Sequence, residues 1–165
     1  MKVFGIVGWK NSGKTGLMER LVDEISSRGF TISTIKHAHH TFDIDQKGKD
    51  SFRHRVAGAQ EVLLSSQKRW ALIHELRNEL EPSLKSLLHK LSPVDLVLVE
   101  GYKHESYLKL EAYRVENKKA PLALTDSDII AIASDTVHAD LDLPVFNLNR
   151  ASDIATFILT KVELV

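Results

Sequence analysis

A glycine-rich octapeptide near the start of the chain limits its possible folds more than any other feature. The pattern G-x-x-x-x-G-K-S/T is matched by Gly8-Trp9-Lys10-Asn11-Ser12-Gly13-Lys14-Thr15. An apolar run over residues 2–8 leads into it, and apolar side chains at helical spacing follow it from Leu17 to Ile25. A buried strand, a tight loop and an amphipathic helix in this order predict a phosphate-binding loop in an α/β domain.

The chemistry of this loop comes from its backbone. Gly8 and Gly13 allow a tight path that a Cβ atom would obstruct. Successive N–H groups then face inward and form an anion site with the positive end of the following helix. We expect Lys14 to reach the β- and γ-phosphates of a nucleotide and the Thr15 hydroxyl to bind Mg²⁺. Gly16, in the first helical turn, is also placed in the site; the motif does not explain it, and close packing near the phosphates is one reason for a glycine there. A chance glycine-rich turn is the alternative, and the flanking strand and helix argue against it.

An acidic side chain is expected to hold the metal ion or to position a water molecule. Asp95 begins an apolar strand and Glu100 ends it. Ligands gather at the carboxyl ends of parallel strands, so Glu100 lies on the phosphate side if this strand neighbours the first one. Glu100 is therefore the predicted metal-binding or water-positioning residue; a carboxylate that only caps the turn at Gly101 is the alternative. Asp95, at the opposite end, is expected to be structural.

The other elements alternate as in an α/β domain with a mostly parallel sheet. A length of 165 residues predicts one domain, residues 1–165. Helices are expected from an Asp50 cap to residue 57, between Pro82 and Pro93, and after a Ser152 cap. Further strands are predicted over residues 31–36, 61–65, 69–74, 95–101, 108–115, 129–134 and 145–148.

Composition excludes several classes of protein. The absence of cysteine excludes disulfide scaffolds, thiolate zinc sites and cysteine nucleophiles. The 22 basic and 22 acidic residues give a formal net charge of zero, so we expect no nucleic-acid partner bound through its backbone charge alone. Because the sequence has neither an apolar run of membrane-spanning length nor a signal-peptide core, we expect no membrane association and a cytoplasmic location.

A histidine-rich loop follows the second predicted strand and opens at the same sheet edge as the phosphate loop. It reads Lys36-His37-Ala38-His39-His40. The spacing is not a zinc signature, so contact with an anionic substrate or phosphate is the preferred interpretation. A solvated polar loop and a transition-metal site are the alternatives.

Several runs of the chain together resemble one known family. They cover residues 35–40, 43–51, 53–59, 67–72 and 95–105, and the last ends in Glu100-Gly101-Tyr102-Lys103-His104-Glu105. With the phosphate loop, they resemble the molybdopterin-guanine dinucleotide biosynthesis adaptor family, MobB. The resemblance implies a three-layer P-loop NTPase fold of the SIMIBI type, with GTP and Mg²⁺ as ligands and at most a slow GTPase activity.

The resemblance also implies partners and a layout of the site. It implies a homodimer that assists the MobA guanylyltransferase in making the guanine dinucleotide form of molybdopterin, with molybdopterin itself as a further candidate ligand. The nucleotide would occupy Gly8–Thr15, and Thr15 and Glu100 would lie near the metal. The segment Lys36–His40 and Lys103 would lie beside the nucleotide.

Two other functions stay open on the residues alone. The guanine-selective tetrapeptide N/T-K-x-D is absent, so a preference for GTP over ATP rests on the resemblance; Asn147 and Asn149 are candidate contacts to a base. A P-loop phosphotransferase with Arg53, Arg55 or Arg69 as its charge-stabilising arginine is one alternative. A non-catalytic adaptor that uses nucleotide only as a structural ligand is the other.

Overall fold

The chain separates into two compact units. The computed structural model describes residues 1–38, 42–136 and 142–165. One unit comprises residues 1–37 and 88–165, and the other comprises residues 38–87. The single domain expected for residues 1–165 stays a prediction, because the compactness of each unit does not test whether either folds alone.

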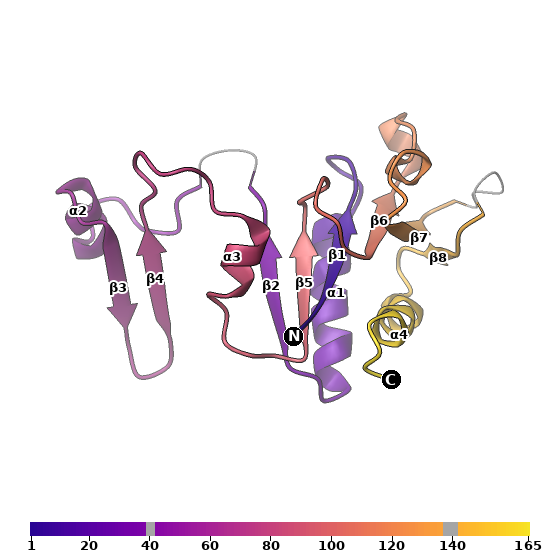
Figure 1. Ribbon diagram of the computed structural model, residues 1–165, viewed down its shortest axis with the longest axis horizontal. Coiled ribbons are helices and arrows are strands. Elements are labelled where there is room, and N and C mark those ends of the chain that lie inside the picture. The colour runs from indigo at the N-terminus through magenta and orange to yellow at the C-terminus, as the bar shows by residue number, and fades with distance from the viewer. Residues whose placement is uncertain (39–41, 137–141) are drawn as a thin grey trace. The chain divides into compact units, whose positions relative to one another are not determined.

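A six-stranded sheet forms the centre of the first unit, in the order β2-β5-β1-β6-β7-β8. Every pairing between neighbouring strands is parallel, and the arrowheads of β2, β5 and β1 point to the same edge (Figure 1). The strands are β1 (Lys2–Val7), β2 (Ile32–Lys36), β5 (Leu96–Glu100), β6 (Lys109–Tyr113), β7 (Ile129–Ser134) and β8 (Val145–Asn147). This arrangement confirms the predicted α/β class with a mostly parallel sheet.

Two helices of the first unit share the hydrophobic core with the sheet. They are α1 (Lys14–Ser27) and α4 (Ala151–Lys161), which contact each other. Leu17, Leu21 and Ile25 of α1 are fully buried, as their helical spacing predicts. Two short 3₁₀ helices, η1 (Val115–Asn117) and η2 (Leu122–Leu124), lie between β6 and β7. None of the helices in the described residues is long and apolar enough to cross a membrane.

The second unit is built on a hairpin. Strands β3 (Glu61–Ser65) and β4 (Trp70–His74) pair antiparallel, and α2 (Asp50–Val56) contacts β3. The guanidinium of Arg55 in α2 contacts two other segments of this unit, through carboxylates of Asp43 at 2.8 Å and Asp45 at 3.3 Å before α2 and of Glu75 at 2.6 Å after β4. Arg55 is therefore engaged in structural ion pairs, which weakens the case for it as a charge-stabilising arginine.

The two predicted helix caps are wrong. Lys49 occupies the N-cap position of α2, and Asp50 is the first helical residue. Arg150 occupies the N-cap position of α4, so Ser152 lies inside the first turn. The Ser152 hydroxyl instead accepts a hydrogen bond from Nη2 of Arg28 at 3.1 Å, and this tertiary contact outweighs the local capping preference.

Helix α3 is shorter than predicted. It covers only Leu84–Leu88, so Pro82 precedes the helix and does not occupy its first position. Beyond Leu88 the chain makes a turn, with the Leu91 amide donating to the Leu88 carbonyl at 3.3 Å. Pro93 disfavours helical backbone in the residue before it, which fits this early end.

Candidate nucleotide-binding site

The loop between β1 and α1 has the backbone of a phosphate cradle. Gly8, Asn11 and Gly13 all have positive φ values, of 145°, 63° and 89°. A Cβ atom on Gly8 would lie 2.3 Å from the carbonyl oxygen of Ala112 in β6, so a larger residue does not fit there. Gly13 also requires glycine, because a Cβ atom there would lie 2.9 Å from the Leu148 side chain.

The amino end of α1 carries the positive potential of the helix dipole. No side chain among the described residues caps this end, and its first turn contains no acidic residue. The helix dipole therefore places partial positive charge where the loop turns into the helix. Thr15 is exposed in this first turn, so its hydroxyl is accessible to a metal ion. These features together suit an anion such as a nucleotide phosphate.

Lys14 folds back across the loop. Its Nζ donates hydrogen bonds to the carbonyl oxygens of Gly8 at 3.0 Å and Trp9 at 2.6 Å, and lies 3.5 Å from the Ser12 hydroxyl. Burial lowers the pKa of Lys14; the Glu100 carboxylate opposes this shift, and the ammonium of Lys103 adds to it. The ammonium of Lys14 is therefore held at the loop, where burial and the charge of Lys103 disfavour its charged form. A bound anion would stabilise that charged form.

Three lysines and one carboxylate converge beside the loop. Lys36 and Lys103 both act on Lys14 through their positive charge. The only negative charge that acts on Lys14 in the described structure is Glu100, whose Oε2 lies 3.5 Å from Nζ of Lys36. Three cations against one anion leave an excess of positive charge, which a nucleotide triphosphate would neutralise.

Glu100 lies where the sequence predicted it. Strand β5 runs between β1 and β2, and in this register Glu100 pairs with both Ile6 and Lys36. Its side chain is thus at the carboxyl edge of the sheet, beside the phosphate loop.

Asp95 lies at the other end of β5 and is structural, as expected. Its carboxylate accepts hydrogen bonds from the Thr31 amide at 2.7 Å and the Thr31 hydroxyl at 2.6 Å. These hydrogen bonds lower the pKa of Asp95.

A groove with a volume of about 640 Å³ opens between Thr15 and Glu100. Lys36 also lines it, and it continues between α1 and β2. Among the described residues, no group of three histidine, aspartate or glutamate side chains is placed to hold a metal ion. A Mg²⁺ ion here would take Thr15 and Glu100 as its protein ligands and complete its shell with phosphate oxygens and water, as Mg²⁺ commonly does.

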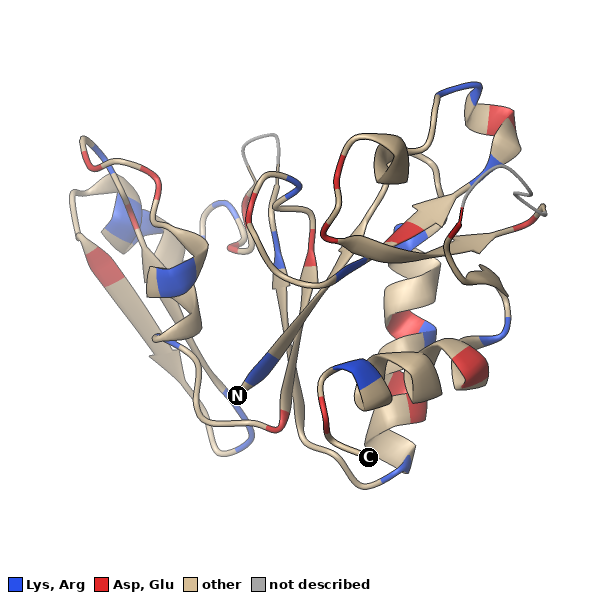
Figure 2. Cartoon of the chain, turned by 45° about the vertical axis from the view of Figure 1, so that its right-hand side comes forward, with Lys and Arg blue, Asp and Glu red and all other residues tan. Residues whose placement is uncertain are grey.

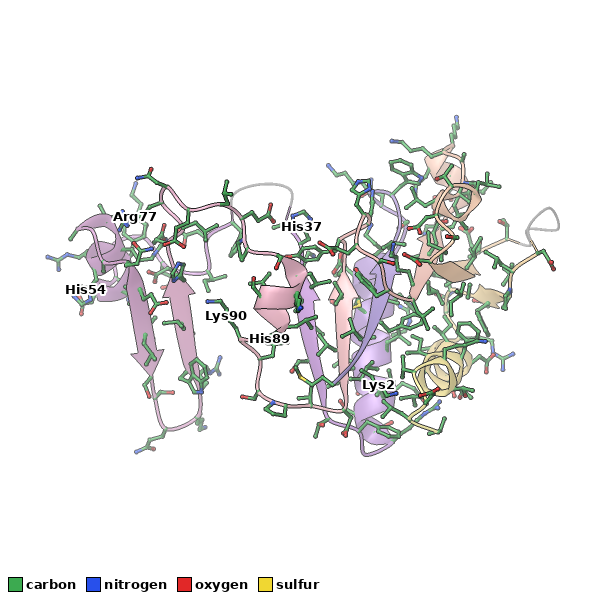
Figure 3. The ribbon with its side chains drawn as sticks, in the orientation of Figure 1. Lys2, His37, His54, Arg77, His89 and Lys90 are labelled. Carbon is green, nitrogen blue, oxygen red and sulfur yellow. The ribbon has the colours of Figure 1, made fainter. Side chains whose placement is uncertain are left out.

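The histidine loop is only partly described. His37 lies at the carboxyl end of β2, at the edge that carries the phosphate loop (Figure 3). Its amide donates to the Glu100 carbonyl at 2.9 Å, and its ring stacks on Tyr102 with a centroid separation of 4.6 Å. These contacts hold His37 beside the site. His39 and His40 fall outside the described residues, so their predicted contact with an anion stays a prediction.

Trp9 connects the loop to a segment whose role the sequence left open. The indole Nε1 donates to the Ala120 carbonyl at 3.0 Å. The ammonium groups of Lys103 and Lys119 lie 4.5 and 4.3 Å from the centre of its ring. Lys10, the next residue of the loop, is exposed. Lys119 was missed from the sequence because no motif marks residues 106–128.

Arg114 was missed for the same reason. Its Nε would lie 3.3 Å from a Cβ atom on Gly13, so its guanidinium borders the phosphate loop. One terminal nitrogen of the guanidinium lies 4.0 Å from a carboxylate oxygen of Asp135. A pattern search restricted to the motif itself could not find Arg114, because it reaches the loop from the end of β6.

Comparison with known proteins supplies the family. The sequence pattern of the family described as "Molybdopterin guanine dinucleotide synthesis protein B" matches residues 3–135. The chain belongs to the MobB family. Over 164 residues it is 38% identical to the molybdopterin-guanine dinucleotide biosynthesis adapter protein of Escherichia coli, covering 98% of this chain and 93% of that protein. The adapter protein of the same name from Haemophilus influenzae is 36% identical over 156 residues, covering 94% of this chain and 86% of the relative.

A solved MobB structure agrees with the fold. The crystal structure of a MobB homolog from Bacillus stearothermophilus superposes with a TM-score of 0.75 at 26% identity and covers 100% of both chains. The predicted family and the predicted P-loop NTPase fold are therefore confirmed. The role of this MobB protein lies in molybdopterin-guanine dinucleotide biosynthesis.

Proposed function

We propose that this MobB-family protein binds GTP with Mg²⁺ at Gly8–Thr15 and assists the guanylyltransferase that makes molybdopterin guanine dinucleotide. The observation that carries the nucleotide part is the convergence of Lys14, Lys36 and Lys103 on the uncapped amino end of α1. Among the described residues, Glu100 is the one carboxylate whose charge acts on Lys14. Family membership and the E. coli and H. influenzae adapter proteins support the biosynthetic part.

The proposed division of work follows from the geometry. Lys14 would exchange its hydrogen bonds to the loop carbonyls for contacts to the β- and γ-phosphates. Thr15 and Glu100 would hold Mg²⁺. We propose that any hydrolysis is slow, because the sequence contains no motif for an arginine finger or a water-positioning glutamine. Arg114 borders the loop, but its guanidinium lies 4.0 Å from the Asp135 carboxylate.

A homodimer is part of the proposal, and an exposed apolar surface on the hairpin supports it. Leu63 and Leu72 face each other across β3 and β4, with 61% and 44% of their surface exposed. Trp70 lies on the same face of the hairpin and is 66% exposed. Adjacent exposed apolar side chains of this size favour burial against another protein surface, and a second copy of the chain is the partner we propose. Light scattering of the protein against a Leu63→Lys variant tests this, with a shift from dimer to monomer expected.

Calorimetric titration with GTP and Mg²⁺ tests the nucleotide site. Removing one charge-assisted hydrogen-bonding group costs about 1.5–3 kcal/mol, so Lys14→Ala should weaken GTP binding by about 10- to 150-fold. Lys161→Ala is the matched control, because it removes the same charge from α4, where Nζ of Lys161 lies over the Phe157 ring. Wild-type affinity in the Lys14→Ala protein would refute the assignment of the phosphate loop.

A further inference from the structure

One face of β6 is polar although the strand is buried inside the sheet. Lys109, Glu111 and Tyr113 alternate along the strand and so project to the same side. Their exposed fractions are 1%, 0% and 7%. Burying charged groups is costly unless each one is paired and hydrogen-bonded. The contacts that these three side chains make therefore indicate what this face holds in place.

The side chain at each end of this face donates a hydrogen bond to the backbone carbonyl of another lysine. At the start of β6, Nζ of Lys109 donates to the Lys103 carbonyl at 2.9 Å and to the Asp126 carboxylate at 2.7 Å. At the end of β6, the Tyr113 hydroxyl donates to the Lys119 carbonyl at 3.0 Å. Lys103 and Lys119 thus extend from backbone positions that buried side chains fix.

The middle of the face holds the segment that carries Lys119. The Glu111 carboxylate accepts hydrogen bonds from the amides of Leu122 and Ala123, at 2.9 and 3.0 Å. These amides belong to η2, which Ala120 and Pro121 separate from Lys119. The segment is therefore tied to the sheet on both sides of Ala120, whose carbonyl also accepts a hydrogen bond from Trp9.

The ammonium groups of Lys103 and Lys119 both lie over the indole of Trp9. Their ammonium groups lie 4.5 Å (Lys103) and 4.3 Å (Lys119) from the ring centre of Trp9. Within residues 1–38, 42–136 and 142–165, neither ammonium has a carboxylate within ion-pair distance. Both positive charges thus lie against the Trp9 ring at the edge of the phosphate loop, without a negative partner in the described structure.

We propose that Lys103 and Lys119, held beside Trp9, form a second anion site that binds the phosphomonoester group of another small molecule next to the nucleotide. A phosphomonoester carries up to two negative charges and three acceptor oxygens, which two ammonium groups match in charge and hydrogen bonding. The charge of Lys103 already reaches Lys14, so this lysine lies between the two sites. Lys119 extends the positive surface beyond the loop. The position of this site next to a nucleotide rests on the proposed function, but the two-lysine site itself does not.

Trp9 makes the site measurable. The chain has two tryptophans, so Trp70→Phe leaves Trp9 as the only indole reporter. Phenyl phosphate is the probe, titrated at constant ionic strength while the phosphate loop is saturated with a non-hydrolysable GTP analogue and Mg²⁺. We expect a saturable change in Trp9 fluorescence. The same change is expected with Lys14→Ala in place of the analogue, because Lys103 and Lys119, which would bind the probe, both lie outside the loop.

Lysine variants in the Trp70→Phe background decide the outcome. Lys103→Gln combined with Lys119→Gln should weaken phenyl phosphate binding by at least about tenfold, the effect of losing one charge-assisted hydrogen bond. Replacing both with arginine should retain binding, and the Lys161→Gln control should change it by less than about twofold.

Two results would overturn the proposal. One is unchanged affinity in the double glutamine variant. The other is loss of the fluorescence change once the analogue fills the loop, which would show that the probe had bound in the loop itself. If the analogue fails to bind the wild-type chain, the proposed nucleotide function fails instead, and the titration without analogue still tests the second site.

Discussion

Replacing Lys109 with methionine tests how strongly the polar face of β6 contributes to stability. Methionine fills nearly the same volume, so little cavity is created and the change removes mainly the charge. Breaking a fully buried ion pair by removing one partner costs about 3–5 kcal/mol. Asp126 is 25% exposed and can regain water, so we expect a loss of about 2–3 kcal/mol in the free energy of unfolding. For a chain of this size, that corresponds to a fall of about 4–12 °C in melting temperature.

Lys2→Met is the matched control, since it makes the same substitution at an exposed ion pair. Nζ of Lys2 lies 3.1 Å from a carboxylate oxygen of Glu163, and the two side chains are 43% and 84% exposed. Such a pair contributes about 0–1 kcal/mol. Urea denaturation of both variants measures the difference. A Lys109→Met protein as stable as the wild type would refute the argument that this buried lysine anchors the loops around β6.

Three further predictions concern the site and its edge. Gly8→Ala should abolish nucleotide binding, because its Cβ would lie 2.3 Å from a backbone oxygen of β6; calorimetric binding at wild-type strength would contradict this. Glu100→Gln should raise the Mg²⁺ concentration needed for GTP binding and release Lys36 from its ion pair, measured by titrating Mg²⁺ at fixed GTP. Asp95→Asn should be less stable than wild type at neutral pH. Since hydrogen bonds from Thr31 lower the folded-state pKa of Asp95, that difference should shrink as the pH falls through the acidic range; a difference independent of pH would contradict the assignment.

The phosphate-loop half of the site could be predicted from the sequence because its signals are local. A strand, a loop motif and an amphipathic helix are read from consecutive residues, and Glu100 follows from the rule for parallel strand ends. The structure places Lys14, Lys36 and Glu100 together as that reasoning requires. The predicted cap at Ser152 failed because its hydroxyl accepts a tertiary hydrogen bond from Arg28. Nothing in the structure explains why Asp50 is the first helical residue and not the cap.

The buried polar face of β6 could not be predicted, because the same alternation of polar and apolar residues normally indicates a different structure. Lys109, Glu111 and Tyr113 alternate with apolar residues, which normally indicates a strand with one face in water. These side chains are buried because they bond to residues outside the strand, such as the carbonyls of Lys103 and Lys119. The distribution of charge does not reveal this buried polar face either, because basic and acidic residues are interspersed along the chain (Figure 2).

The central claim is that Gly8–Thr15 holds a guanine nucleotide, and calorimetric titration of the purified protein with GTP and with ATP, each with Mg²⁺, tests it most directly. The account predicts saturable GTP binding that is tighter than ATP binding and that Lys14→Ala weakens. Equal or tighter binding of ATP would contradict the guanine assignment and favour the phosphotransferase alternative. No binding of either nucleotide would contradict the claim altogether and leave an adaptor whose loop holds no nucleotide.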